Sequence, residues 1–139
     1  MDTKLKADIA ESAVCTELLS RDFSVLKPIG DRLPYDIAVD IKGKLIRIQV
    51  KHAWYNKKDN AYMVDVRRTK TNRRQMVRKR YDDNDFDFAV ILIGEKWIFY
   101  VIPSVVFNSF ASSISFVEDS KRQRSPMSDQ YRENWYLIQ

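Results

Sequence analysis

One stretch of this sequence carries a carboxylate, an amide and an ammonium group, on Asp36, Gln49 and Lys51. Asp36 offers a charged oxygen and Gln49 a neutral one, and Mg²⁺ is often held by one or two carboxylates with water and a substrate phosphate. The backbone carbonyl of Val50 is a candidate for a third oxygen ligand. Lys51 could position an attacking water and stabilise charge on phosphorus oxygens. The same residue types also line solvated strand faces without a role, and spacing alone leaves both interpretations open.

These residues lie in two segments whose pattern predicts a β-hairpin. Residues 35–41 and 44–53 alternate apolar and polar side chains, and Lys42-Gly43 between them is typical of a two-residue turn. In that register Asp36 lies opposite Gln49, with Cβ atoms about 4.5–5.5 Å apart, and Lys51 projects from the same face. The apolar pairs expected on the core face are Tyr35 with Val50, Ile37 with Ile48, and Val39 with Ile46.

Glu11 is a fourth candidate, in a segment that the pattern predicts to be a helix from Thr3 to about Ser20. Its neighbours on that helix form an apolar stripe of Ala7, Val14, Cys15 and Leu18. A carboxylate in such a stripe is costly unless it is paired, protonated or bound to metal. A role in the site and a plain position at the edge of the stripe, reaching water or pairing with Lys4, are both open.

The remaining pattern predicts a mixed α/β chain folded as one domain, because 139 residues suffice for one hydrophobic core and not for two. The second half of residues 67–80, around Gln75, Met76 and Val77, has a composition that favours a helix. A C-terminal extension covers about residues 111–139. The other expected elements are strands at 23–26, 62–66 (beside the hairpin), 88–93, 97–102 and 114–117, a short helix from Pro103-Ser104, and a terminal helix near 128–135.

Basic side chains are concentrated in residues 67–80, in a chain with a net charge of +5 and a pI near 9.3. A solvated helix face usually interleaves acidic residues, and this segment has none, so we expect contact with nucleic acid. A second basic patch follows in the C-terminal extension. The residues predicted to bind DNA are Arg67, Arg68, Lys70, Arg73, Arg74, Arg78, Lys79, Lys121, Arg122 and Arg124.

Single copies of histidine and cysteine exclude several other classes of site. One His and one Cys cannot build a zinc finger, and His52 is expected to be structural or to face DNA rather than to act as a base. Cys15 alone cannot form a disulfide within the chain, which favours a reducing compartment. The longest apolar run, residues 88–93, is far shorter than a membrane span. We therefore expect a soluble, cytoplasmic protein with no membrane partner and no small-molecule substrate.

Three features of this sequence together resemble the PD-(D/E)XK nuclease superfamily. They are Glu11 in the predicted helix, Pro34-Tyr35-Asp36 at the start of the hairpin, and Gln49-Val50-Lys51 on its return strand. The basic residues 67–74 and the segment Phe86-Asp87-Phe88-Ala89 resemble, more narrowly, bacterial group I intron-encoded homing endonucleases of that superfamily. Tyr35 separates Pro34 from Asp36, and Gln49 stands where the superfamily usually has Asp or Glu, which predicts weaker metal binding. Other members are known with Gln at this position.

The resemblance implies a restriction-endonuclease-like core, in which helices flank a mixed central sheet in a three-layer α/β/α arrangement. It implies that Glu11, Asp36 and Gln49 surround Mg²⁺ or another divalent cation, and that Lys51 is the catalytic lysine. It also implies cleavage of a long double-stranded DNA target by a homodimer or a dimer of dimers (tetramer). A two-fold dimer is economical, because one active site cuts one strand.

Two other functions fit the same residues. A Holliday-junction or repair nuclease of this fold would prefer branched DNA, so a cleavage assay that offers branched and linear substrates separates it. A catalytically inactive nucleic-acid-binding protein is favoured by Gln49 alone. Metal-dependent cleavage that is lost on replacement of Lys51, while binding persists, would exclude that second alternative.

Overall fold

The computed structural model describes residues 2–71, 76–118 and 127–139, and for residues 68–71, 76–79 and 127 it describes the backbone alone. A five-stranded sheet in the order β1-β2-β3-β8-β9 forms its centre. The elements are α1 (Thr3–Ser20), β1 (Ser24–Leu26), β2 (Ile37–Ile41), β3 (Lys44–His52), β4 (Trp54–Asn56), β5 (Ala61–Asp65), β6 (Arg67–Thr71), β7 (Met76–Arg80), β8 (Phe88–Ile93), β9 (Ile98–Pro103), α2 (Ser104–Asn108), β10 (Ser113–Phe116), and the 3₁₀ turns η1 (Met127–Tyr131) and η2 (Trp135–Leu137).

The β2–β3 hairpin has the predicted register. Ile41 pairs with Lys44, and Ile37 pairs with Ile48. Lys42 and Gly43 both have positive φ, 53° and 87°, which matches the twist of a two-residue hairpin turn and is easiest with Gly at the second position. The backbone N–H of Gly43 also donates to the Oδ1 atom of Asp40 at 2.7 Å. Local turn chemistry and the alternating pattern therefore agree, and the predicted hairpin is confirmed.

The central sheet is mixed. β3 runs parallel to β8, whereas β1–β2, β2–β3 and β8–β9 are antiparallel. β8 is apolar at every position, and all its residues after Phe88 are buried, as expected for a strand covered on both faces. The strand predicted at residues 88–93 is confirmed without a change of boundary.

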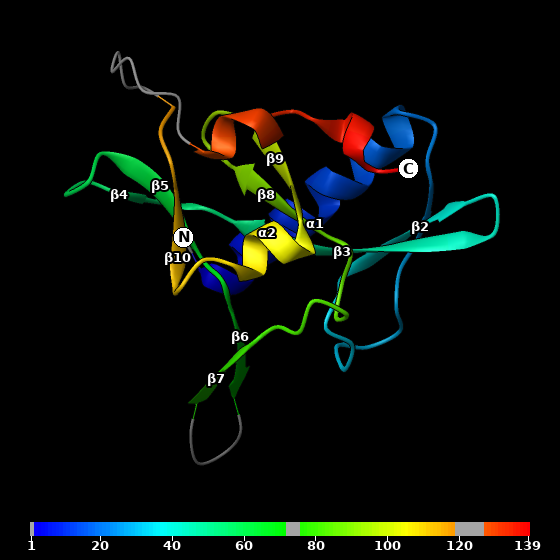
Figure 1. Ribbon diagram of the computed structural model, residues 1–139, viewed down its shortest axis with the longest axis horizontal. Coiled ribbons are helices and arrows are strands. Elements are labelled where there is room, and N and C mark those ends of the chain that lie inside the picture. The colour runs from blue at the N-terminus through cyan, green and yellow to red at the C-terminus, as the bar shows by residue number, and fades with distance from the viewer. Residues whose placement is uncertain (1, 72–75, 119–126) are drawn as a thin grey trace.

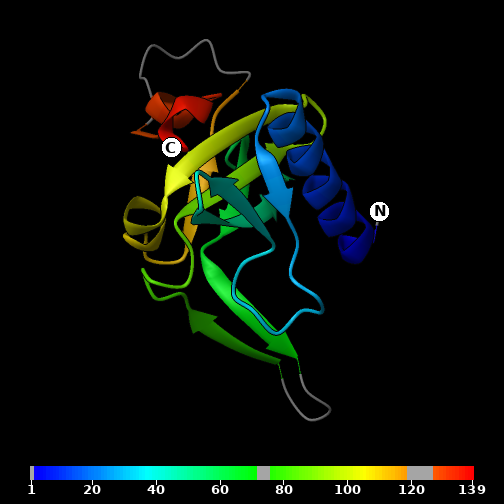
Figure 2. The ribbon, with the colours of Figure 1, turned by 90° about the vertical axis from the view of Figure 1, so that its right-hand side faces the viewer.

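Different elements cover the two faces of the central sheet (Figures 1 and 2). On one face α1 packs with the C-terminal η2, through Ala10, Val14, Leu18, Trp135 and Ile138. On the other face lie α2 and a small antiparallel sheet in the order β10-β5-β4. The mixed sheet with helices on either side is the predicted fold class, and the second face is covered by strands as well as by a helix.

The helix expected in the second half of residues 67–80 is not found in the described residues there, because Met76–Arg80 is the strand β7. β6 and β7 instead make an antiparallel hairpin, in which Arg67 pairs with Arg80 and Thr71 with Met76. Helix propensity is a weak preference, and here cross-strand hydrogen bonding and β-branched Thr69, Thr71 and Val77 outweigh it. The hairpin projects from the body of the molecule (Figures 1 and 2). Gln75 lies outside the described residues.

Two further expectations need correction. The strand predicted at residues 62–66 is β5, but it pairs with β4 and β10 rather than with the β2–β3 hairpin. The predicted terminal helix near residues 128–135 is replaced by the 3₁₀ turns η1 and η2. Glu133, with φ 52°, interrupts the helical path, and its backbone N–H donates to the carbonyl of Phe99 at 2.7 Å. Contact with the edge of β9 therefore replaces a helical hydrogen bond.

None of the helices in the described residues combines the length and the apolar character that crossing a membrane would require.

Gly94, directly after β8, gives a test of packing beside β3. A Cβ atom there would lie 2.5 Å from Nε2 of His52, whose Nδ1–H donates to the carbonyl of Ala53 at 3.0 Å. Gly94→Ala is therefore expected to lower the free energy of unfolding by about 1–3 kcal/mol, measured by urea denaturation. Removing the ring should relieve the clash, so Gly94→Ala should cost much less in a His52→Ala background. An equal cost in both backgrounds would contradict this account.

Candidate active site

Asp36 occupies the position directly before β2, where the hairpin opens toward one end of the sheet. Its backbone N–H donates to the carbonyl of Ile48 at 2.9 Å, which holds the chain in register. Its Oδ2 atom accepts two hydrogen bonds of 2.9 Å, from Nε2 of Gln49 and from the backbone N–H of Val50. The structure thus brings together the carboxylate and the amide that the register predicted to be opposite.

The Asp36 carboxylate is held in surroundings that penalise its charge. Burial raises its pKa, and the negative charge of Glu11 raises it further, while the Val50 N–H and the ammonium groups of Lys51 and Lys27 act in the opposite direction. Within the described part of the chain, its hydrogen bonds all go to Oδ2 and none to Oδ1. A half-buried carboxylate whose Oδ1 atom accepts no hydrogen bond from the described residues is a suitable ligand for a cation.

The Gln49 amide presents its nitrogen to the other oxygens of the cluster. Nε2 donates to Oδ2 of Asp36 and, at 3.3 Å, to the carbonyl of Val50. A half-turn about the last side-chain bond exchanges Nε2 for Oε1. The amide therefore stabilises the carboxylate by a hydrogen bond and can also supply a neutral oxygen ligand.

Lys51 projects from the same strand face as Gln49, but its ammonium group turns to the neighbouring segment. Nζ donates to the carbonyl of Arg67 at 3.3 Å and lies 5.1 Å from the centre of the Tyr81 ring. Burial lowers the pKa of Lys51, and the charges of Asp65 and Asp36 oppose that effect. The lysine therefore couples electrostatically to Asp36 across the site, without a direct hydrogen bond to it.

Glu11 reaches the site from α1. It is paired, but its partner is Lys27 rather than the Lys4 considered from the sequence. Its Oε1 atom lies 2.6 Å from Nζ of Lys27, the residue directly after β1. The negative charge of Glu11 raises the pKa of Asp36, and the positive charge of Lys27 acts in the opposite direction. Lys27 is not among the site residues predicted from the sequence. The signal that could have found it is the pairing of β1 with β2, which brings the end of β1 alongside the start of β2.

The donor atoms of this cluster fit a hard cation. The described residues contain no group of three or more His, Cys, Asp or Glu side chains placed to hold a metal. What they offer is the carboxylates of Asp36 and Glu11, the amide of Gln49 and the carbonyl of Val50, all oxygen donors. Mg²⁺ needs only one or two protein carboxylates, whereas Zn²⁺ prefers nitrogen and sulfur ligands.

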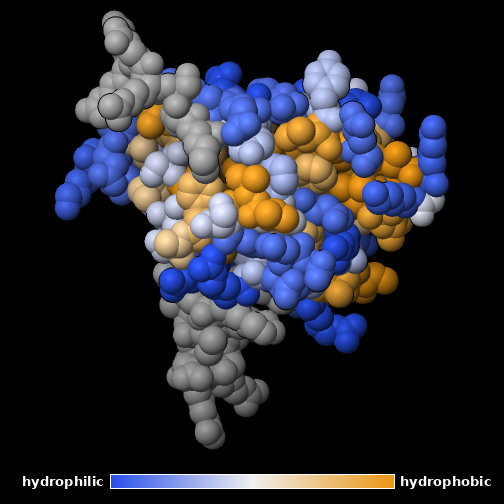
Figure 3. All heavy atoms as spheres, viewed as in Figure 1, coloured by the Kyte–Doolittle hydropathy of each residue, from blue (hydrophilic) through white to orange (hydrophobic). Residues whose placement is uncertain are grey.

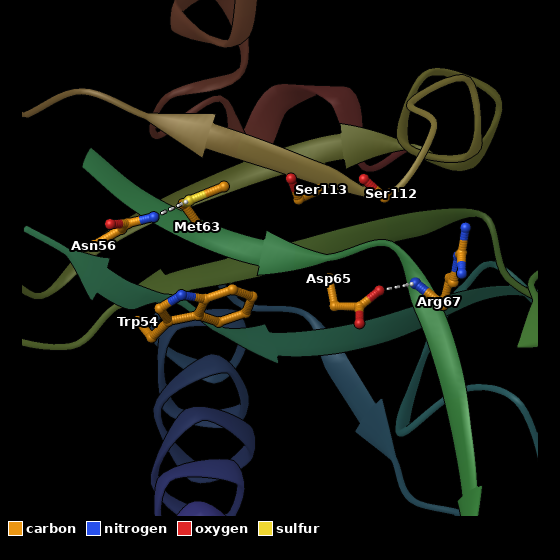
Figure 4. Close-up of a pocket in the computed structure, with 7 residues that line it drawn as sticks. All are labelled: Trp54, Asn56, Met63, Asp65, Arg67, Ser112 and Ser113. Carbon is orange, nitrogen blue, oxygen red and sulfur yellow. Dashed lines mark hydrogen bonds between the residues drawn. The ribbon is translucent and has the colours of Figure 1, made fainter. Parts of the chain in front are cut away.

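A pocket of about 320 Å³ is lined by residues of β4, β5, β6 and the start of β10 (Figure 4). Arg67 belongs both to the pocket wall and, through its carbonyl, to the environment of the lysine. Asp65 Oδ1 accepts from the Arg67 backbone N–H at 2.8 Å, which fixes the junction of β5 and β6 (Figure 4). The pocket is lined by Trp54, Asn56, Met63, Asp65, Arg67, Ser112 and Ser113.

The predicted DNA-binding residues are only partly described. Arg67 is half-buried at the root of the β6–β7 hairpin, and its Nε atom is buried without a hydrogen-bond partner among the described residues. Arg68 and Lys70 lie in β6 and Arg78 and Lys79 in β7, where the backbone alone is described. Arg73, Arg74, Lys121, Arg122 and Arg124 lie outside the described residues.

Comparison with known proteins gives this constellation a family. A family model described as PD-(D/E)XK endonuclease matches residues 1–138. The chain belongs to the PD-(D/E)XK endonuclease family. The resemblance inferred from Glu11, Asp36, Gln49 and Lys51 is thereby confirmed at the level of the family, and the endonuclease activity follows from membership.

A solved structure supports the same PD-(D/E)XK fold. The chain is similar to the bacterial homing endonuclease I-Ssp6803I, with 51% sequence identity over 99% of this chain and 93% of that chain, and a TM-score of 0.91. The restriction-endonuclease-like fold class is therefore confirmed. No curated protein matches the chain in sequence.

Proposed function

We propose that this endonuclease is site-specific, as a homing endonuclease is, and hydrolyses double-stranded DNA with the help of a divalent cation, by preference Mg²⁺. The observation that carries the proposal is the Asp36 carboxylate, which accepts hydrogen bonds of 2.9 Å from the Gln49 amide and the Val50 N–H. The charges of Glu11 and Lys51 shift its pKa. The 51% identity to a protein described as a bacterial homing endonuclease supports it.

Each residue of the site has a distinct task in this reaction. Asp36, Glu11, the Gln49 amide and the Val50 carbonyl would hold the cation through oxygen atoms. When bound, the cation supplies Lewis acidity to the phosphate and acidifies a coordinated water. Lys51 supplies a positive charge, buried among protein groups, that stabilises the negative charge developing on the phosphate oxygens. Burial strengthens this effect, because screening by water is weak there.

The β6–β7 hairpin is the part of the protein best suited to hold DNA. Its strands carry Arg67, Arg68, Lys70, Arg78, Lys79 and Arg80, and an antiparallel ribbon of this kind fits the major groove. Arg80 anchors its base to the turn after α2, donating to the carbonyls of Asn108 and Phe110 at 2.5 and 3.1 Å. The carbonyl of Arg67 contacts Lys51. DNA held by this hairpin therefore lies beside the candidate active site.

A homodimer or a dimer of dimers would bring a second active site to the opposite strand. On the face shown in Figure 3, apolar side chains gather at the end that carries the β2–β3 turn and the C-terminal residues. Leu45 and Leu19 are 51% and 59% exposed. An apolar surface of this kind suits contact between subunits. Light scattering during size-exclusion chromatography measures the state directly.

The function is tested by incubating the purified protein with Mg²⁺ and a long random-sequence DNA library, and sequencing the ends. We expect breaks at one recurring sequence, and no breaks when EDTA removes the metal. A branched DNA junction is included as a competing substrate, because preferential cleavage there would indicate a junction-resolving or repair nuclease instead. DNA binding without any cleavage would contradict the proposal and indicate an inactive binding protein.

Gln49→Glu tests whether residue 49 faces the cation. The change replaces the amide donor to Asp36 by a second carboxylate, so the metal-free protein should lose about 1–3 kcal/mol of stability. Mg²⁺ should then stabilise the variant more than the wild type, because binding to the folded state alone raises stability. Thermal unfolding in EDTA and in excess Mg²⁺ measures both effects. Gln139→Glu, at an exposed position, is the matched control. Equal stabilisation of variant and wild type by Mg²⁺ would argue against the assignment.

A further inference from the structure

Lys27 holds a position that the reaction described above does not use. Its Nζ atom lies 2.6 Å from Oε1 of Glu11, one of the two carboxylates assigned to the cation. The ammonium group also acts on the charge of Asp36, the other carboxylate. A positive side chain therefore lies against one of the carboxylates that a divalent cation would need, and it acts on the other through space.

The fold brings Lys27 to this place. It directly follows β1, which is held by pairing of Leu26 with Ala38 in β2, next to the segment that carries Asp36. The α1 helix, which carries Glu11, contacts β1 and β3. The Lys27 side chain itself is 55% exposed, against 28% for Glu11. The backbone is thus anchored, while the ammonium group can turn to solvent without disturbing the core.

Two lysines already act on the carboxylates at this end of the sheet in the absence of a metal. Glu11 and Asp36 contribute two negative charges, and Lys27 and Lys51 contribute two positive ones. A divalent cation would bring two further positive charges into the same space. Lys51 is only partly exposed and donates to the Arg67 carbonyl, whereas the Lys27 side chain is 55% exposed, so Lys27 is the lysine that can turn away to solvent.

We propose that Lys27 is an internal competitor of the metal ion: its ammonium group occupies Glu11 in the metal-free protein and must be displaced, or repelled at close range, when a divalent cation binds. Competition does not require both cations to use the same oxygen. If the metal took Oε2 while Lys27 kept Oε1, the two positive charges would still lie a few ångströms apart and repel one another. In either case the protein alone should hold its metal weakly. This inference rests on the proposed function, because it assumes that Glu11 is a metal ligand.

The test is the affinity of the DNA-free protein for Mn²⁺, measured from the electron paramagnetic resonance signal of the free ion. Lys27→Met removes the charge and keeps an unbranched side chain of similar length. We expect it to bind Mn²⁺ roughly tenfold more tightly than the wild type, the size that removing one partly screened positive charge a few ångströms away should produce. Lys27→Arg, which keeps the charge, should bind like the wild type.

Two controls make the result specific. Lys44→Met makes the same change at an exposed position of the hairpin and should leave the Mn²⁺ affinity within about twofold of the wild type, because water and salt screen distant charges. In a Glu11→Gln background, Lys27→Met should give little gain, since the carboxylate for which the two cations compete is gone.

The outcomes separate this inference from the proposed function. If the wild type binds Mn²⁺ and cleaves DNA, but Lys27→Met leaves the affinity unchanged, Lys27 is not a competitor and the proposed function stands. If Lys27→Met and Lys44→Met raise the affinity equally, the effect is one of net charge and the inference fails. If no variant binds Mn²⁺ and no metal supports cleavage, the proposed function fails and the inference fails with it.

Discussion

Asp36→Asn is expected to reduce the single-turnover rate of DNA cleavage by about 10³-fold or more, equivalent to roughly 4 kcal/mol of activation free energy. Asp36 is the only charged ligand candidate on the hairpin, and the substitution keeps its size and an acceptor for the Val50 N–H while removing the charge. Because burial already raises the pKa of Asp36, the loss of its charge should leave the stability of the metal-free fold unchanged or higher.

The measurement compares cleavage under saturating Mg²⁺ with DNA affinity and thermal stability of the same preparations. Affinity for DNA should change little, because phosphate contacts come chiefly from basic residues. Asp40→Asn is the matched control, since Asp40 lies on the same hairpin and its Oδ1 atom only accepts from Gly43 in the turn. A rate for Asp36→Asn within about tenfold of the wild type, roughly 1.4 kcal/mol, would count against Asp36 as a metal ligand.

Lys51→Met should lower the cleavage rate by about 10²–10³-fold, as expected for the loss of one preorganised group that stabilises charge in the transition state. The buried ammonium group acts on Asp36 through space and donates only to the Arg67 carbonyl among the described residues. Its removal should therefore weaken catalysis far more than it weakens folding. Methionine fills a similar volume beside Tyr81, so a large cavity is avoided.

Added metal should not restore the activity of the Lys51→Met variant. Raising the concentration of Mg²⁺ should recover little activity in Lys51→Met, because the cation ligands remain and the missing charge acts at the phosphate. Lys44→Met, an exposed lysine of the same strand, should cleave at the wild-type rate. Full rescue of Lys51→Met by high Mg²⁺ would assign the lysine to metal binding and would contradict its role at the phosphate.

The hairpin that carries Asp36 and Gln49 could be predicted from the sequence because its determinants are local. A two-residue turn with positive φ at Lys42 and Gly43 sets one register, and a shift by one residue would expose every apolar side chain of the core face. The strand of residues 88–93 was equally predictable, since a short, continuous apolar run suits a strand covered on both faces. The family resemblance followed from the same residues, with Glu11 added.

The β6–β7 hairpin shows where local reasoning failed. Helix-forming residues such as Met76 favoured a helix, but the preference is a few tenths of a kcal/mol per residue, of order RT. Pairing of residues 76–80 with residues 67–71 decides the conformation instead. The partner of β5 was missed for a similar reason, because β10 follows it by about fifty positions and no periodicity in the sequence links the two strands.

By itself the sequence determined the helix that carries Glu11, the hairpin register that sets Asp36 beside Gln49, and the family, because these depend on turn chemistry, periodicity and motif order within short segments. Only the tertiary structure decided that Lys27 pairs with Glu11 and that Lys51 is buried against the carbonyl of Arg67. The first contact joins α1 to the residue after β1, and the second joins β3 to the start of β6. Their existence depends on how α1 and the strands pack together, since long, flexible lysine side chains have no partner until that packing places an acceptor within reach.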